Sequence, residues 1–204
     1  MTPPVTVTVW TDYICPWAYG ARHQTEWLRG QGVEVRLRAY ELHPEIPPEG
    51  RPVRPGGRLD GVFDHIAEEC ATRNQPFVKP TFTPNSHLVL EVLELVVAHH
   101  PNAVADLDDA LATAYWVDGS PIDDRDSLRR HTDTVLGQEA SATLWGRWAD
   151  GEGQRLLEAG RDEAHELGVT ATPAWRIGEL TVTGLHPDAQ FERWMTRVIE
   201  RTAG

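Results

Sequence analysis

Apolar and polar residues alternate at the start of the chain. Val5, Val7 and Val9 are separated by threonines, and the stretch "VEVRLRAYEL" repeats this alternation over residues 33–42. A period of two residues is typical of a strand with one buried face. Between them lies "CPWAYGARHQTEWLRGQG", in which Pro16 suits the first position of a helix and glycines suit its end. The pattern predicts a strand–helix–strand unit, most simply with parallel strands.

The middle of the chain has the period of helices. The stretch "HPEIPPEGRPVRPGG" is crowded with proline and glycine, so we expect a loop and a boundary there. After it, Asn85 and Ser86 can cap the strongly apolar "HLVLEVLELVVAHH". Further helices are predicted at residues 60–73, 103–117, 125–136, 139–149 and 151–167.

After Gly168 the period returns to two. The stretches "TPAWRIG" and "LTVTG" predict paired strands that turn at Gly178 and Glu179, and "HPDAQFERWMTRVIERT" predicts a closing helix. The predicted fold class is therefore α/β, with a βαβ…ββα order interrupted by an all-helical insertion. We expect residues 1–57 and 151–204 to form one discontinuous domain and residues 58–150 to form the insertion.

Composition and charge narrow the function classes. The 204 residues include 31 acidic and 19 basic ones, and the net charge of −12 argues against nucleic acid or an anionic membrane as partner. There is no apolar run long enough to span a bilayer, and "MTPPVTVTVW" does not resemble a secretory signal, so we expect a cytoplasmic location. The nine histidines show no convincing zinc spacing with cysteine, and no metal site is expected.

The two cysteines are the main candidates for chemistry. Cys15 directly precedes Pro16 at a strand-to-helix turn, and Ala18 stands where a Cys-x-x-Cys pair would have its second thiol. A thiol at a helix start can have its pKa lowered to about 3.5–7.5, and the thiolate is the nucleophilic form. The alternative is a buried, inert cysteine. For Cys70 we favour a packed thiol over a remote resolving partner of Cys15.

Four stretches together resemble the DsbA family of thioredoxin-fold proteins, in particular its FrnE-like branch: "DYICPWAYG", "PNSHLVLEVLELV", "GVTATPAW" and "VTGLHPDAQFERWM". The resemblance implies a thioredoxin-like fold for the discontinuous domain. It also implies that Ala18 replaces the second active-site cysteine, and that Thr172 and Pro173 are joined by a cis bond that lies against Cys15.

The candidate site follows from the thiol and from this resemblance. Cys15 is the predicted catalytic residue, and the predicted substrate-binding residues are Tyr13, Pro16, Trp17, Thr172 and Pro173. The tryptophans of the insertion are expected in the core, with a pocket role as the alternative; they are Trp116, Trp145 and Trp148. Three histidines are expected at the surface or at helix caps; they are His43, His87 and His186.

Three functions remain open. The first is a thiol-dependent oxidoreductase in which Cys15 alone exchanges with a low-molecular-weight thiol of the glutathione or mycothiol type, with no tightly bound cofactor. The second is a cis-trans isomerase of a small unsaturated metabolite, because the DsbA family resembles the 2-hydroxychromene-2-carboxylate isomerases. The third is a non-catalytic binding protein. A deep apolar cavity beside the insertion would favour the isomerase, and a shallow groove beside Thr172 would favour thiol exchange. A homodimer is left open.

Overall fold

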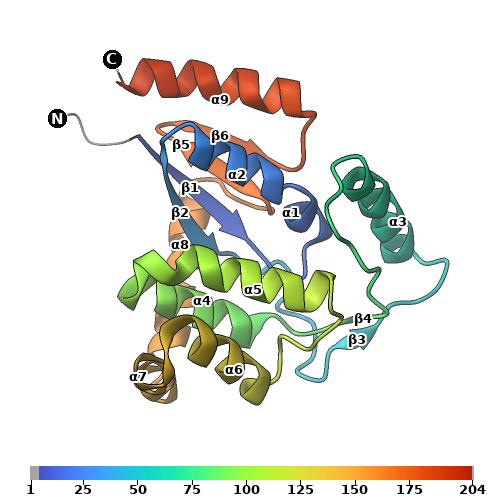
Figure 1. The fold of residues 1–204 in the computed structure, drawn as a ribbon, viewed down its shortest axis with the longest axis vertical. Helices are drawn as coiled ribbons and strands as arrows, with labels where there is room; N and C mark the ends of the chain where they lie inside the picture. The colour runs from blue at the N-terminus through green and yellow to red at the C-terminus, as the bar shows by residue number, and fades with distance from the viewer. Residues whose placement is uncertain (1–4, 204) are drawn as a thin grey trace.

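The structure is a computed structural model that describes residues 5–203. Its main sheet has the strand order β2-β1-β5-β6 (Figure 1). The central strand β1 (Thr6–Thr11) runs parallel to β2 (Glu34–Ala39) and antiparallel to β5 (Ala174–Ile177), which pairs with the antiparallel edge strand β6 (Leu180–Thr183). The predicted parallel first pair and antiparallel last pair are therefore confirmed.

The connection from β1 to β2 contains two helices where the pattern predicts one. Helix α1 (Pro16–Gly20) is followed by Ala21, whose ψ of 4° departs from the helical value, and α2 (Arg22–Gly30) begins at the next residue. Glycine is a poor helix former, so Gly20 marks the weakest point of the segment. The short α1 carries Cys15 at its N-terminal end.

Helices fill the middle of the chain, as predicted. They are α3 (Arg58–Ala71), α4 (His87–His99), α5 (Val104–Trp116), α6 (Arg125–Leu136), α7 (Gln138–Ala149) and α8 (Glu152–Glu166), with a short 3₁₀ turn at Pro101–Ala103. The closing helix is α9 (Asp188–Ala203). In Figure 1, α4 to α7 lie on one side of the sheet region, α9 and α2 on the other, and α3 stands beside α1. No helix within residues 5–203 has both the length and the apolar character needed to cross a membrane.

A short two-stranded ribbon joins the insertion to the site. The strands β3 (Arg51–Pro52) and β4 (Phe82–Thr83) pair antiparallel within segments that the sequence indicates only as loops. Strands of two residues have no detectable period, so their pairing comes from the tertiary structure. The ribbon places residues of the insertion next to the loop that follows β2.

The two faces of the sheet are covered by different helices. Val7 and Val9 belong to the large hydrophobic cluster that includes Leu28 of α2 and Phe191 of α9. Trp10, on the opposite face, packs in a small cluster with Ala164 of α8. The large cluster also contains apolar residues of α3, α4, α5 and α7, so the sheet and the insertion share one core. The division of the chain into a discontinuous domain and an insertion, with boundaries at residues 57/58 and 150/151, remains a prediction.

Candidate active site

Cys15 lies at the turn between β1 and α1. Its backbone is extended, with φ of −81° and ψ of 112°, and it occupies the N-cap position, with Pro16 in the first turn. Its amide donates to the carbonyl of Asp12 at 3.0 Å, and its own carbonyl accepts from the amide of Tyr19 at 3.1 Å. The thiol is therefore held at a helix start, as the sequence indicates.

The segment before β5 lies beside the thiol. Antiparallel pairing places Trp10 opposite Ala174, so the residues preceding β5 lie next to those that follow β1. The Cys15 Sγ donates to the carbonyl oxygen of Thr172 at 3.3 Å, and the peptide bond between Thr172 and Pro173 is cis. Two segments more than 150 residues apart in the chain thus meet at one sulfur.

Burial decides the protonation of this thiol. Cys15 is only 4% exposed, and loss of solvation raises its pKa to about 11. The side chain of Thr172 and the backbone amides of Ala18 and Trp17 lower the pKa of Cys15, whereas the charge of Asp12 raises it further. The expectation of a lowered pKa is therefore wrong for this structure, because burial outweighs the helix start. The resting group is a neutral thiol.

Asp12 is a buried carboxyl whose part in the site the sequence reasoning missed. It is 1% exposed, and its two oxygens accept from the amides of Ile14 at 3.2 Å and Leu42 at 2.9 Å. Burial raises its pKa to about 6 despite these bonds. The Asp12 side chain connects the loop after β1 to the loop after β2, and these bonds help to fix the backbone that leads to Cys15. An acidic residue directly after an apolar strand was the available signal.

A cavity of about 370 Å³ opens beside Cys15. Its walls come from the start of α1, the loop after β2, the ribbon and the first turns of α3. The lining residues are Ile14, Cys15, Pro16, Trp17, Leu42, His43, Arg51, Arg58, Leu59, Val62 and Thr83. We call this space the cysteine cavity. It lies between the sheet domain and the insertion, and its walls are mostly apolar apart from Cys15, two arginines, a histidine and a threonine.

Only some of the predicted binding residues line this cavity. Pro16 and Trp17 do, and Trp17 also contacts His65 of α3, with ring centroids 5.4 Å apart. Tyr13 does not: it is 3% exposed, its hydroxyl lacks a hydrogen-bond partner among the described residues, and its carbonyl accepts from Trp116. Tyr13 is therefore a core residue, and its assignment to substrate binding is corrected. Its neighbours Ile14 and Cys15 line the cysteine cavity, while Tyr13 does not.

Ala18 and Pro173 line a separate, very small cavity. Its volume is about 20 Å³, which is enough for about one water molecule. Thr172 contacts the thiol through its backbone and does not line the cysteine cavity. Cys15 and Pro173 thus line different cavities.

The other candidate residues are buried in the fold or hydrogen-bonded to neighbouring side chains. Cys70 is 1% exposed in α3, and burial raises its pKa to about 11; neither cysteine forms a disulfide. Trp116 and Trp145 are core residues, 1% and 2% exposed, which is the reading we favoured. Trp148 is half-buried and donates to a carboxylate of α4. Hydrogen bonds that the His87 ring donates to the carboxylates of Glu41 and Glu91 raise the pKa of His87 to about 10.

His43 and His186 each form a hydrogen bond with a residue close in sequence. His43 lies in the wall of the cysteine cavity, where its ring pairs with Glu45 at 2.9 Å. His186 contacts the carbonyl of Thr183 at 3.0 Å. Across residues 5–203, no three side chains of His, Cys, Asp or Glu are grouped so that they could hold a metal ion.

Comparison with known proteins agrees with this arrangement. A sequence model described as the DSBA-like thioredoxin domain matches residues 6–195. The chain belongs to the DSBA-like thioredoxin domain family. The match spans the sheet and the insertion alike, so the predicted thioredoxin-like α/β fold with a helical insertion is confirmed.

Several solved structures share the fold at low sequence identity. The probable DsbA oxidoreductase of Streptomyces coelicolor superposes with a TM-score of 0.80, at 20% identity over 95% of this chain and 89% of that one. A 2-hydroxychromene-2-carboxylate isomerase gives 0.73, at 18% identity over 97% and 98%. The cytosolic disulfide reductase DsbM of Pseudomonas aeruginosa, with glutathione, gives 0.70, at 18% identity over 95% and 98%. The same fold thus occurs in oxidoreductases and in an isomerase.

Proposed function

We propose that the chain is a monothiol oxidoreductase of the FrnE-like branch, with Cys15 as its nucleophile and a small thiol of the glutathione or mycothiol type as co-reactant. The observation that carries the proposal is the position of the Cys15 sulfur. It lies at the start of α1, 3.3 Å from the carbonyl of Thr172, and in the wall of a cavity that can admit a small molecule. The backbone of Thr172, which adjoins the sulfur, would orient an extended thiol-bearing partner.

The exchange needs two steps because position 18 carries no thiol. In the first step the Cys15 thiolate attacks one sulfur of a small disulfide; a new disulfide forms at Cys15 and the other half leaves as a thiolate. In the second step an external thiolate attacks the bound half, forms a new small disulfide and returns Cys15 to its starting state. Cys15 is oxidised and then reduced, and the electrons pass from the external thiol to the small disulfide.

The proposal is tested by coupled turnover. Hydroxyethyl disulfide and reduced glutathione are the substrates, and glutathione reductase reports the glutathione disulfide through the loss of NADPH. We expect the wild type to accelerate NADPH oxidation, Cys15→Ser to give only the uncatalysed background, and Cys70→Ser to retain activity. Intact mass should show one glutathione on the wild type, located at Cys15 and removed by dithiothreitol.

Two results would overturn the assignment. One is turnover that survives Cys15→Ser, because the nucleophile would then be a group other than the Cys15 thiol. The other is a wild type that neither turns over nor forms a mixed disulfide at Cys15. Cys70→Ser is the matched control, since it removes the other buried thiol of similarly raised pKa.

The shape of the cysteine cavity favours a second candidate, a thiol-dependent isomerase. The Cys15 thiolate would add to an activated double bond, the resulting single bond would rotate, and elimination would restore the thiolate with no net redox change. Maleate is a suitable probe, with its conversion to fumarate followed by proton NMR with and without glutathione. Conversion that disappears in Cys15→Ser would move the assignment to this class. Binding without any Cys15-dependent conversion or exchange would leave a binding protein.

We also propose a cytoplasmic location. Both cysteines are unpaired in the described part of the chain, and a single-thiol cycle depends on a supply of reduced small thiol. Fractionation of cells followed by immunodetection tests this, and recovery of the protein outside the cytoplasmic fraction would contradict it.

A further inference from the structure

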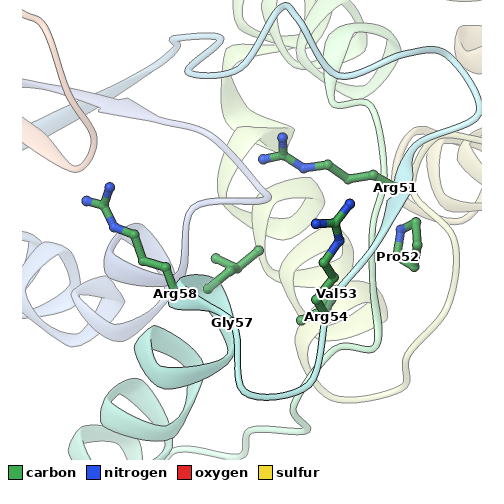
Figure 2. Close-up of a pocket in the computed structure, with 7 residues that line it drawn as sticks. Arg51, Pro52, Val53, Arg54, Gly57 and Arg58 are labelled. Carbon is green, nitrogen blue, oxygen red and sulfur yellow. The ribbon is translucent and has the colours of Figure 1, made fainter.

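A group of three arginines adjoins the cysteine cavity. Arg51, Arg54 and Arg58 lie within eight residues of chain, in β3, in the loop that follows and at the start of α3. Figure 2 shows their guanidinium groups on the same side of the loop that joins β3 to α3. They line an open cavity of about 460 Å³, which we call the arginine cavity; the other lining residues are Pro52, Val53, Gly57 and Leu59.

The two cavities are neighbours with a common wall. Arg51, Arg58 and Leu59 line both of them. A molecule in the cysteine cavity therefore adjoins two of the three arginines, Arg51 and Arg58. The apolar side chains of the cysteine cavity suit the carbon skeleton of such a molecule, while its sulfur would meet Cys15.

The three arginines have no anionic partner in the protein. Among residues 5–203, none of their guanidinium groups forms an ion pair or a side-chain hydrogen bond. Glu45 is close enough for Arg51 to contribute to the lowering of its pKa, but its carboxylate pairs with His43. Asp60, the next acidic residue after the arginines, pairs with Lys79 at 2.7 Å.

This lack of partners is notable because acidic residues outnumber basic ones in the chain by 31 to 19. Arginines elsewhere in the fold, such as Arg22 and Arg38, bind carboxylates of neighbouring helices. Exposed arginines on a plain surface would need no explanation beyond solvation. Here they border the cavity that contains the one thiol at a helix start, so their charge is available to a ligand of that cavity.

We propose that the arginine cavity binds the acidic groups of the substrate whose sulfur reacts at Cys15. The substrate class is a small thiol or disulfide that carries two or more carboxylate or phosphate groups. Guanidinium groups bind both kinds of group through paired hydrogen bonds, and three of them in one cavity favour a polyanion over a single charge. The inference rests on the proposed function, because it assigns the specificity of the same site.

Two chromogenic disulfides separate charge recognition from thiol reactivity. Dithiobis(nitrobenzoate) carries two carboxylates, whereas dithiodipyridine is uncharged at neutral pH. In each case the Cys15 thiolate attacks the disulfide, a mixed disulfide forms at Cys15, and the other half leaves as a coloured thiol. The rate measured for Cys15→Ser is subtracted, which removes any contribution of Cys70.

The test variant is the double substitution Arg51→Gln/Arg58→Gln. We expect its rate with dithiobis(nitrobenzoate) to fall about tenfold, with little change for dithiodipyridine, because only the first probe presents anions to the arginines. The matched control is Arg193→Gln/Arg197→Gln on the exposed surface of α9, which removes the same charge elsewhere. It should preserve both rates. Added salt should slow the reaction of the wild type with the anionic probe more than that of the test variant.

The possible failures point to different conclusions. Equal losses with both probes in the test variant would overturn the inference, because the arginines would then act on the fold or on Cys15 itself. An equal loss with the anionic probe in the control would also overturn it, since net charge alone would explain the effect. In both cases the proposed function survives. If neither probe modifies Cys15 in the wild type, the proposed function is overturned, and the arginine assignment with it.

Discussion

At the residue scale, opposed effects act on the thiol of Cys15. Backbone amides at the start of α1 stabilise the thiolate, while burial destabilises it and raises the pKa to about 11. The thiol donates its hydrogen to the carbonyl of Thr172, which suits the neutral form. Reaction therefore begins with loss of this proton, and only a small fraction of the protein carries the thiolate at neutral pH.

The pH dependence of Cys15 alkylation should show this. With iodoacetamide, which is uncharged, we expect the rate to rise about tenfold per pH unit up to at least pH 9.5, because the thiolate fraction grows that way below the pKa. The measurement is the pseudo-first-order rate from intact mass, with the rate of Cys15→Ser subtracted. A plateau below pH 8 would contradict the account and would restore the lowered pKa expected from the helix start.

Asp12→Asn serves as the charge control in the same experiment. The negative charge of Asp12 raises the pKa of Cys15, so its removal should move the whole rate profile to lower pH. The amide keeps one acceptor oxygen but cannot accept from both Ile14 and Leu42, so we expect a loss of about 1 kcal/mol in the free energy of unfolding. Circular dichroism checks that the variant is folded. An unchanged profile in a folded variant would show that Asp12 does not act on Cys15 electrostatically.

The position of Cys15 could be predicted from the sequence, but its protonation could not. An alternating strand followed by Cys-Pro places the thiol at a helix start through local rules alone. The burial that raises its pKa comes from distant segments, such as the one containing Thr172, and no local pattern reports it. Tyr13 shows the same limit: its closeness to Cys15 in sequence suggested a role in the site, but the side chain is buried in the core.

At the element scale, the ribbon of β3 and β4 connects the insertion to the site. It holds Arg51 at both cavities and Thr83 at the cysteine cavity. Gly50, directly before β3, has a φ of +68°, and a Cβ there would collide with the ring of Phe82 and lie 2.8 Å from the carbonyl oxygen of Thr83. Only glycine meets both the backbone and the space requirement at this position.

Gly50→Ala should therefore weaken the ribbon. We expect a cost of about 1 kcal/mol for the positive φ and about 1–3 kcal/mol more for the collision with Phe82 and Thr83. Gly56→Ala is the matched control: its φ is +69° but nothing lies within 4 Å of the added carbon, so only the first cost applies. Urea unfolding monitored by tryptophan fluorescence measures both. Equal losses in the two variants would contradict the packing argument.

The elements differ in how far the sequence determines them. The long helices, α4 among them, could be predicted because each has its own apolar stripe and lies within a few residues of the expected range. The ribbon could not, because each of its strands has two residues and its pairing depends on chain segments some thirty residues apart. The break between α1 and α2 at Ala21 could not be predicted either, because the spacing of apolar residues is not changed by so short an interruption of the helix.

At the scale of the whole molecule, the sheet and the insertion act as one packing unit around the site. They share a single large hydrophobic cluster, and the cysteine cavity is built from both. The surface charge is strongly negative overall, yet the arginine cavity beside Cys15 is cationic. The arginine cavity would thus attract a small acidic thiol to this site despite the negative net charge of the chain.

The most direct measurement is the mass of the protein after incubation with a cell extract, followed by acid quenching and peptide mapping. The account predicts one adduct on Cys15, with the mass of a small acidic thiol, that dithiothreitol removes. Cys15→Ser should carry no such adduct. An unmodified Cys15, or a reducible adduct found only on Cys70, would contradict the central claim that Cys15 is the reacting group.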